Sequence, residues 1–388
     1  MTKQNKKSIF KLKYCKNCIL PNTRPNIYFN KKSQMCSVCN SINEKKQKID
    51  WNFRKQKFKK LVKNAKRKNK TYDCIIPVSG GKDSTWQVLT AIKYGLKPLC
   101  VTWKTPGRNK VGILNLKNLI SLGVDHIDFT INPKIEKYFT KKAFERFGNP
   151  LVPMHMAIHA LPLNLASKMK IPLILWGENS GIEYGGNQKN LKGEYMTHAW
   201  RKVYGVTHGT TAKDWVDKYM NINDLSSYSW VSEKEKKTYG IKEIFLGYYF
   251  KWDPQKIYKL SKKSGFKSDT KPKTGYYNYA DIDEEFLITV HHWMKWYKYG
   301  FSRLWDNLSI EIRNNRLTRK KALEIIKKKG TELPIREIKQ FCKYSELSVK
   351  KFFVIAEKFR DKEIWKRKKF GNWKIDGFLI DNWKWKNK

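Results

Sequence analysis

The sequence predicts an α/β fold: a doubly wound parallel sheet preceded by a small cysteine-rich module and followed by a helical region. Three features lead to this class. Apolar runs typical of buried strands alternate with helix-like segments between residues 72 and 180. A glycine pair, Gly80-Gly81, joins the first such run to a helix, and two Cys-x-x-Cys pairs lie near the N-terminus.

The N-terminal module is predicted to bind zinc. Its four cysteines have the spacing of a tetrahedral site in which thiolates close the coordination shell, so the metal is expected to be structural. These are Cys15, Cys18, Cys36 and Cys39. Disulfide pairing is the alternative, and a reducing compartment disfavours it. We assign residues 1–43 to a zinc ribbon and expect the metal to supply much of its stability.

Residues 44–70 are rich in lysine and carry Trp51, Phe58 and Leu61 at helical spacings, which predicts a basic amphipathic connector helix. The formal net charge of +47 arises mostly from lysines scattered along the whole chain. We interpret this charge as a compositional bias and expect no nucleic-acid partner. An anionic substrate and attraction to a membrane surface are secondary interpretations.

The loop after the first strand, Ile75–Val78, is predicted to bind phosphate. Its residues are Ser79, Gly80, Gly81, Lys82, Asp83 and Ser84. The glycines let backbone N–H groups converge on an anion, and the helix expected from Ser84 adds its N-terminal dipole. Lys82 supplies a cation, and Asp83 is placed to hold Mg²⁺ or to order the loop, so both are candidate catalytic residues. The glycine spacing of a Walker A loop is absent. An ordinary strand-to-helix turn is the alternative.

The rest of this α/β domain, assigned to residues 71–280, follows the same alternation. Helices are expected near residues 84–94, 109–122, 134–147 and 155–169, and strands at residues 98–103, 126–131 and 171–176. Ligands bind outside the carboxyl ends of parallel strands, so the phosphate loop, Thr102–Thr105 and Gly177–Ser180 should surround one crevice. Glu178, with Asn179 beside it, is a candidate for Mg²⁺ or substrate; helix capping or solvation in a loop is the alternative.

The second half of the chain is predicted to enclose the crevice. Residues 181–280 are rich in loops and aromatic side chains, which suggests a substrate-enclosing insertion. Near its end, Lys271 and Lys273 precede Gly275 in a segment that resembles a glycine-turned loop, from which the lysines can reach phosphates. Residues 281–388 are assigned to a helical region, with helices at residues 284–299, 302–314 and 318–329. Its tryptophans Trp373, Trp383 and Trp385 are expected in core or interdomain packing.

No apolar stretch is long enough to span a bilayer, and no signal peptide is recognisable at the N-terminus, so a cytoplasmic protein is expected. The three remaining cysteines, Cys74, Cys100 and Cys342, lie in apolar contexts without a nearby histidine motif. We therefore expect no glutaminase activity in this chain.

Several of these motifs occur together, in one order, in a known family. The phosphate loop resembles the pyrophosphate loop of the ATP pyrophosphatase superfamily. Together with the cysteine pairs, Gly177–Gly181 and Gly300-Phe-Ser-Arg303, it makes residues 13–345 similar to the N-acetyl sugar amidotransferases of surface-polysaccharide and nonulosonic-acid biosynthesis. Where that family tends toward Gly-Phe-Gly-Arg, this chain has Ser302, which leaves the exact sugar open. Arg303 becomes a further candidate for substrate binding.

This resemblance implies a reaction and its partners. ATP, with Mg²⁺, would activate the acetamido group of a nucleotide-linked N-acetyl sugar as an O-adenylyl imidate, and ammonia would then displace AMP to leave an acetamidino group. Separate glutaminase and cyclase-like subunits would supply the ammonia.

Two other classes of function stay open from the sequence. A tRNA-modifying enzyme of lysidine or thiolation type also uses a pyrophosphate loop, although thiolation requires further catalytic cysteines that have no motif here. A non-catalytic binding module would use the cysteines and lysines for a partner and would make the loop dispensable.

Overall fold

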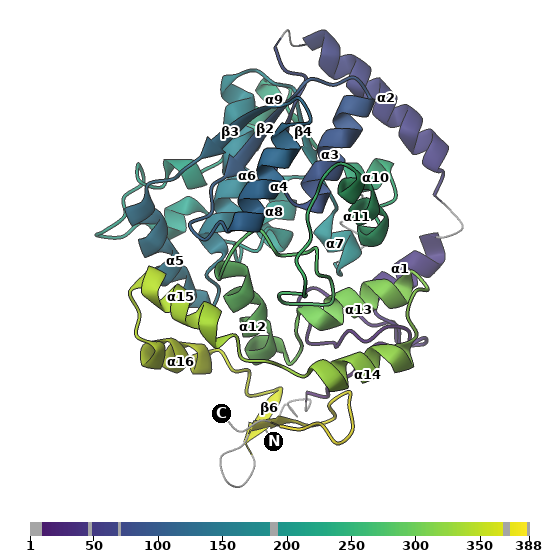
Figure 1. Ribbon diagram of the computed structural model, residues 1–388, viewed down its shortest axis with the longest axis vertical. Helices are drawn as coiled ribbons and strands as arrows, with labels where there is room; N and C mark the ends of the chain where they lie inside the picture. The colour runs from purple at the N-terminus through teal and green to yellow at the C-terminus, as the bar shows by residue number, and fades with distance from the viewer. Residues whose placement is uncertain (1–9, 46–48, 69–70, 187–192, 368–372, 386–388) are drawn as a thin grey trace, which may run out of the picture.

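The computed structural model describes residues 10–45, 49–68, 71–186, 193–367 and 373–385. Its centre is a parallel sheet of five strands in the order β3-β2-β1-β4-β5 (Figure 1). The strands are β1 (Cys74–Pro77), β2 (Pro98–Trp103), β3 (Asp125–Phe129), β4 (Leu173–Trp176) and β5 (Lys242–Phe245). The register aligns Cys74 with Pro98 and Leu173 with Lys242.

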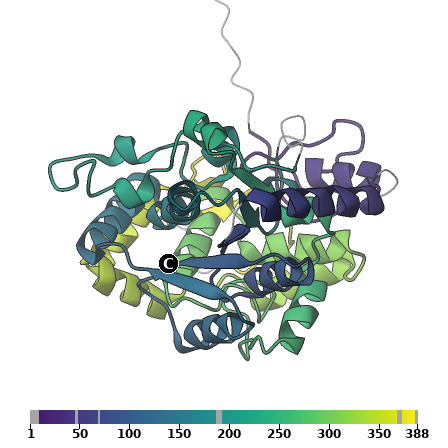
Figure 2. The same ribbon diagram turned by 90° about the horizontal axis from the view of Figure 1, so that it is seen from above.

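Helices cover both faces of this sheet, which confirms the predicted doubly wound class (Figure 2). The helices between β1 and β4 are α3 (Lys82–Lys93), α4 (Lys110–Ile120), α5 (Pro133–Phe147) and α6 (Val152–Lys168). Alternate strand residues point to opposite faces. Ile76 and Cys100 therefore pack with α3 and α4, whereas Ile75 and Val101 pack with α6.

Local sequence explains where these helices begin and end. The Asn109 side chain caps α4 by accepting from the backbone N–H of Gly112, and Asn132 caps α5 ahead of Pro133. Gly148 ends α5 in the left-handed conformation. Helix α3 begins at Lys82, two positions before the expected Ser84, so the candidate catalytic residues belong to its first turn.

The segment expected to be loop-rich, residues 181–280, also completes the sheet. Strand β5 was not predicted, because it has only four residues and two of them are Lys242 and Glu243. The same part of the chain forms the short helices α7 (Ser180–Glu183), α8 (His198–Tyr204), α9 (Glu233–Thr238), α10 (Leu246–Tyr249) and α11 (Pro254–Lys263). Helix α11 packs on α3, behind the phosphate loop.

The N-terminal and C-terminal regions lie against each other (Figure 1). Helix α1 (Ser37–Lys45) carries the last of the four cysteines and extends past the expected boundary at residue 43, and α2 (Trp51–Lys68) packs on α10. The C-terminal helices are α12 (Leu287–Tyr299), α13 (Arg303–Arg313), α14 (Arg319–Lys329), α15 (Ile335–Ser345) and α16 (Val349–Lys358).

The last two helices were not anticipated from the sequence, nor was a hairpin of β6 (Trp365–Arg367) and β7 (Trp373–Ile375). Trp373, Trp383 and Trp385 pack against the hydrophobic cluster that joins the cysteines to α12 and α13. Among the described residues, no helix has both the length and the apolar character to cross a membrane.

Candidate active site

A cavity of about 520 Å³ opens at the carboxyl ends of the central strands. Its walls come from the loop after β1, the segments after β2 and β4, helix α6, and residues 277–284 ahead of α12. This is the position at which parallel α/β sheets bind ligands. Five of the six residues of the phosphate loop line the cavity, and Gly80 lies behind them.

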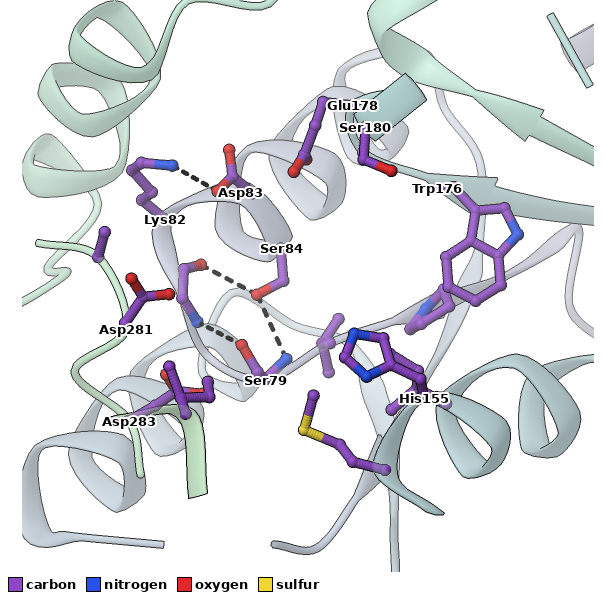
Figure 3. Close-up of a pocket in the computed structure, with 18 of the residues that line it drawn as sticks. Ser79, Lys82, Asp83, Ser84, His155, Trp176, Glu178, Ser180, Asp281 and Asp283 are labelled. Carbon is purple, nitrogen blue, oxygen red and sulfur yellow. Dashed lines mark hydrogen bonds and ion pairs between the residues drawn. The ribbon is translucent and has the colours of Figure 1, made fainter. Parts of the chain in front are cut away.

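Gly80 lets the phosphate loop pack directly on α4. Its φ of +86° is left-handed, and a Cβ here would lie 2.5 Å from the backbone nitrogen of Leu116. Hydrogen bonds then shape the loop: the Ser79 hydroxyl accepts from the Gly81 N–H at 3.2 Å, and the Ser84 hydroxyl donates to the Gly81 carbonyl at 2.9 Å (Figure 3). The turn therefore requires glycine for both its conformation and its close contact.

Lys82 and Asp83 form an ion pair at the start of α3 (Figure 3). The Lys82 side chain is largely buried, and its ammonium lies 5.7 Å from the ring centre of Trp252. The indole N–H of Trp252 donates to Asp83 Oδ1 at 3.0 Å. A cation and a carboxylate are thus held beside the first turn of α3, where the helix dipole favours an anion.

Glu178 faces this pair from the end of β4 (Figure 3). Burial and the nearby charge of Asp83 raise the pKa of Glu178 to about 7, although Lys82 and Arg303 act in the opposite direction. Two carboxylates that oppose each other in this way fit a divalent cation, which prefers oxygen ligands.

Asp281 and Asp283 complete the polar end of the cavity, on the other side of the loop from Glu178 (Figure 3). Burial and the charge of Asp281 raise the pKa of Asp283. Lys273 is half-buried and lowers the pKa of Asp283, so its charge acts on this end of the cavity although it does not line it. Neither aspartate was predicted from the sequence, in which the Asp-x-Asp pattern of residues 281–283 was the available signal.

Arg303 lines the cavity from the start of α13. Its guanidinium lies 5.0 Å from the ring centre of Tyr184, and its Nε lies 3.6 Å from Asp281 Oδ2. Behind it, Lys295 forms an ion pair with Asp306. Burial alone would raise the pKa of Asp306, but the surrounding cations, including Arg303, hold it well below its usual range.

The structure gives two other predicted site residues different positions. Asn179 does not line the cavity: its Oδ1 caps α7 through the Gly181 N–H at 3.1 Å and accepts from the Trp200 indole at 3.0 Å. Helix capping was the alternative to a ligand role for Glu178, and here it is the neighbouring Asn179 that caps the helix. Lys271 is exposed and lies outside the cavity wall.

The opposite end of the cavity is aromatic and was not anticipated from the sequence. Its walls include His155, His159, Trp176 and Trp200. The His159 ring lies 5.5 Å from that of Trp176, and its buried Nδ1 has no hydrogen-bond partner among the described residues. Burial lowers the pKa of His159 well below its usual value, so the ring is neutral. His155 and His159 lie one turn apart on α6, but Trp176 and Trp200 come from other segments and share no motif with them.

The four cysteines form one cluster outside the cavity. Their Sγ atoms lie within 4.8 Å of one another and all four residues are buried. Backbone N–H groups of Cys18 and Cys36 donate to Cys15 Sγ at 3.4 and 3.2 Å, which favours a thiolate. This donor set fits a closed structural Zn²⁺ site.

Cys100 lies outside this cluster, in the core of the sheet. Burial raises the pKa of its thiol to about 12, as expected for an unreactive core cysteine.

Comparisons with known proteins give a partial match. No curated protein sequence matches this chain. Among solved structures, NMN synthetase from Francisella tularensis aligns with a TM-score of 0.26 and 14% identity, over 50% of this chain and 93% of that chain. Residues 273–377 match the family described as LPS biosynthesis protein WbpG-like, C-terminal domain. The matched region contains Asp281, Asp283 and Arg303, so part of the cavity wall belongs to a domain similar to that of lipopolysaccharide-biosynthesis proteins.

Proposed function

We propose that this chain is an ATP-dependent, AMP-forming amidotransferase that converts the acetamido group of a nucleotide-linked N-acetyl sugar into an acetamidino group. The observation that carries the proposal is the loop Ser79–Ser84, which faces a cavity of about 520 Å³ and places a buried cation at a helix N-terminus. The match of residues 273–377 to a lipopolysaccharide-biosynthesis family supports a sugar of a surface polysaccharide as the substrate.

The loop is the proposed site of the pyrophosphate of ATP. Its backbone is held open by the left-handed Gly80, and the ammonium of Lys82 lies at the same end of α3. Backbone N–H groups, the helix dipole and a lysine together stabilise negative charge, which grows on the leaving pyrophosphate as the reaction proceeds. This preorganised arrangement is the principal catalytic contribution that we assign to the loop.

ATP is needed because an amide is a poor electrophile and its oxygen is a poor leaving group. In the first step the amide oxygen attacks the α-phosphorus, the bond from the α-phosphorus to the bridging oxygen breaks, and pyrophosphate leaves. The amide N–H proton passes to solvent, which leaves an O-adenylyl imidate. Ammonia then adds to the imidate carbon, the carbon–oxygen bond breaks, and AMP leaves with that electron pair while the added nitrogen loses a proton.

The carboxylates around the loop are the proposed Mg²⁺ ligands. Asp83 and Glu178 face each other, and the raised pKa of Glu178 reflects a buried negative charge that a cation would neutralise. Asp281 and Asp283 offer further oxygens at the same end. When bound there, Mg²⁺ would neutralise phosphate charge and orient the triphosphate. We propose that Arg303 then contacts an anionic part of the substrates and that the charge of Lys273 acts on the same end of the cavity.

The phosphates and Mg²⁺ are proposed to occupy the polar end of the cavity, so the uncharged rings of the substrates would bind at its aromatic end. Trp176 and Trp200 offer flat apolar faces, and His159 offers one polar atom. Binding sites commonly combine such apolar walls with a few polar groups that set orientation.

Ammonia is proposed to come from a separate glutaminase with a cyclase-like subunit, in the cytoplasm.

One incubation tests this function. The protein is mixed with ATP, Mg²⁺, ammonium and a panel of nucleotide-linked N-acetyl sugars, and the nucleotides and sugars are analysed by mass spectrometry. We expect AMP, pyrophosphate and a sugar in which one oxygen is replaced by NH. Formation of ADP, or AMP formation that depends on tRNA instead of a sugar, would contradict the proposal. Efficient use of glutamine by the purified chain alone would contradict the separate source of ammonia.

A further inference from the structure

The four-cysteine module, residues 10–45, contacts the wall of the cavity directly. Arg24 lies between the two cysteine pairs, and its Nε donates to the carbonyl oxygen of Tyr184 at 2.6 Å. Its guanidinium also lies 5.9 Å from the ring centres of Tyr184 and Phe301, and its Nη2 lies 3.5 Å from Asp306 Oδ1. Tyr184 is a cavity residue, so one arginine of the module holds part of the site.

A second arginine holds the neighbouring carbonyl. Arg313 is buried at the end of α13 and donates from Nη2 to the carbonyl oxygen of Glu183 at 2.7 Å. Two successive carbonyls at the end of α7 are thus fixed by arginines, one carried by the module and one at the end of α13.

Gly185 extends this contact. Its φ of +121° is left-handed, and a Cβ built there would lie 3.5 Å from Val38 and 3.6 Å from Ile27, both in the module. The segment that follows Glu178 and Ser180 therefore contacts the module at Tyr184 and Gly185, and the preceding Glu183 is held by Arg313 of α13.

The contacts continue from Tyr184 to the reactive end of the cavity. The Tyr184 ring packs edge-on against Trp252 at 6.2 Å between ring centres, and the Trp252 indole N–H donates to Asp83 at 3.0 Å. On its other side, Tyr184 lies under the guanidinium of Arg303. A displacement of Tyr184 would therefore move the partners of both Asp83 and Arg303.

We propose that Arg24 is a positioning residue through which the four-cysteine module orders residues 180–185 and, with them, the walls of the cavity around Tyr184. The module then acts as part of the active-site framework in addition to stabilising itself. Arginine suits this role because one planar group donates to a carbonyl, pairs with a carboxylate and stacks on rings at the same time. The inference builds on the proposed function, because it concerns the same cavity.

The test compares three variants of the full-length, zinc-loaded protein by hydrogen exchange with mass spectrometry. Arg24→Lys keeps the charge but loses the planar group, and Arg24→Gln keeps an N–H donor but loses the charge. Arg54→Lys is the matched control: Arg54 also donates to a backbone carbonyl, that of Tyr248 at 2.8 Å, and stacks on that ring at 4.0 Å, but outside the cavity.

We expect the amides of Ile182, Glu183 and Tyr184, which bond to Asn179 and Ser180, to exchange about tenfold faster in both Arg24 variants, because a hydrogen bond to a charged group is lost or weakened. The zinc content should stay unchanged, and kcat should fall with little change in KM for ATP. The Arg54 control should leave these amides and kcat unaltered.

Unchanged exchange at residues 180–185 in both Arg24 variants would overturn the proposal, as would equal acceleration in the Arg54 control. Loss of zinc from the Arg24 variants would also overturn it, because Arg24 would then serve the module itself. Exchange and zinc content are measured without sugar or ammonia, so failure of the proposed reaction leaves this test intact.

Discussion

Replacement of Gly80 by alanine tests whether the loop must approach α4 as closely as the structure indicates. Two costs can be worked out separately. The left-handed φ of +86° costs a residue with a Cβ about 1–2 kcal/mol. The new Cβ would also lie 2.5 Å from the Leu116 nitrogen, whereas real Cβ contacts start near 3.0 Å, so the loop or the helix must move by at least about 0.5 Å.

Such a displacement has a predictable kinetic effect. A misplacement of 1 Å in a catalytic site costs about 10²-fold in rate, so 0.5 Å should lower kcat by about tenfold or more. Crowding against backbone adds about 1–3 kcal/mol to the loss of stability, because backbone atoms yield less easily than a flexible side chain. For Gly80→Ala we therefore expect the free energy of unfolding to fall by about 2–5 kcal/mol in total.

Gly123→Ala is the matched control. Gly123 has a φ of +92°, almost the same as that of Gly80, but a Cβ there meets nothing within 4 Å. We expect it to lose only the conformational cost, about 1–2 kcal/mol, and to keep its kcat. Urea unfolding gives the stabilities, and release of pyrophosphate gives the rates. If Gly80→Ala matched Gly123→Ala in both measurements, the close approach of the loop to α4 would be refuted.

Three further predictions concern other parts of the molecule. Lys82→Met should lower AMP formation by roughly 10²-fold or more while circular dichroism stays unchanged, because the cation acts on developing charge; full activity would exclude the role of the loop. Burial raises the pKa of Glu136 to about 7, and the hydrogen bond from the Trp103 indole N–H offsets only part of this rise. Because the folded state then binds more protons than the unfolded state between about pH 4.5 and about pH 7, the free energy of unfolding falls as pH rises through this range. Glu136→Gln should thus match the native protein at about pH 4 and exceed its free energy of unfolding by up to about 3 kcal/mol at about pH 8; a pH-independent difference would contradict the assignment. Cys36→Ser should lose most of the bound zinc, measured by atomic emission, and unfold at lower urea; retention of zinc would show that the cluster is not the metal site.

The central part of the site could be predicted because its signals are local. The order strand, glycine pair, helix N-terminus is contained in residues 75 to 84, and the cavity at the carboxyl ends of the strands follows from parallel topology alone. Glu178 and Arg303 were placed by short motifs and do line that cavity. Their assigned roles in binding and catalysis stay predictions.

Other features could not be predicted because no local pattern encodes them. Strand β5 is short and half polar, and it is a strand because it pairs with β4. Asp283 and His159 reach the cavity from an irregular segment and from a helix whose apolar residues show no one-sided pattern. Their relevance arises only when distant segments converge.

The sequence by itself determined the elements whose chemistry depends on spacing: two cysteine pairs that can close around a metal, and a glycine turn that presents N–H groups at a helix start. These follow from covalent geometry and from the permissive backbone of glycine. Only the tertiary structure decided that the cysteine module would support the cavity through Arg24 and Tyr184, residues 160 positions apart. Contacts across that distance depend on how whole elements pack, since burial and charge pairing are set by the assembled neighbours and not by adjacent residues.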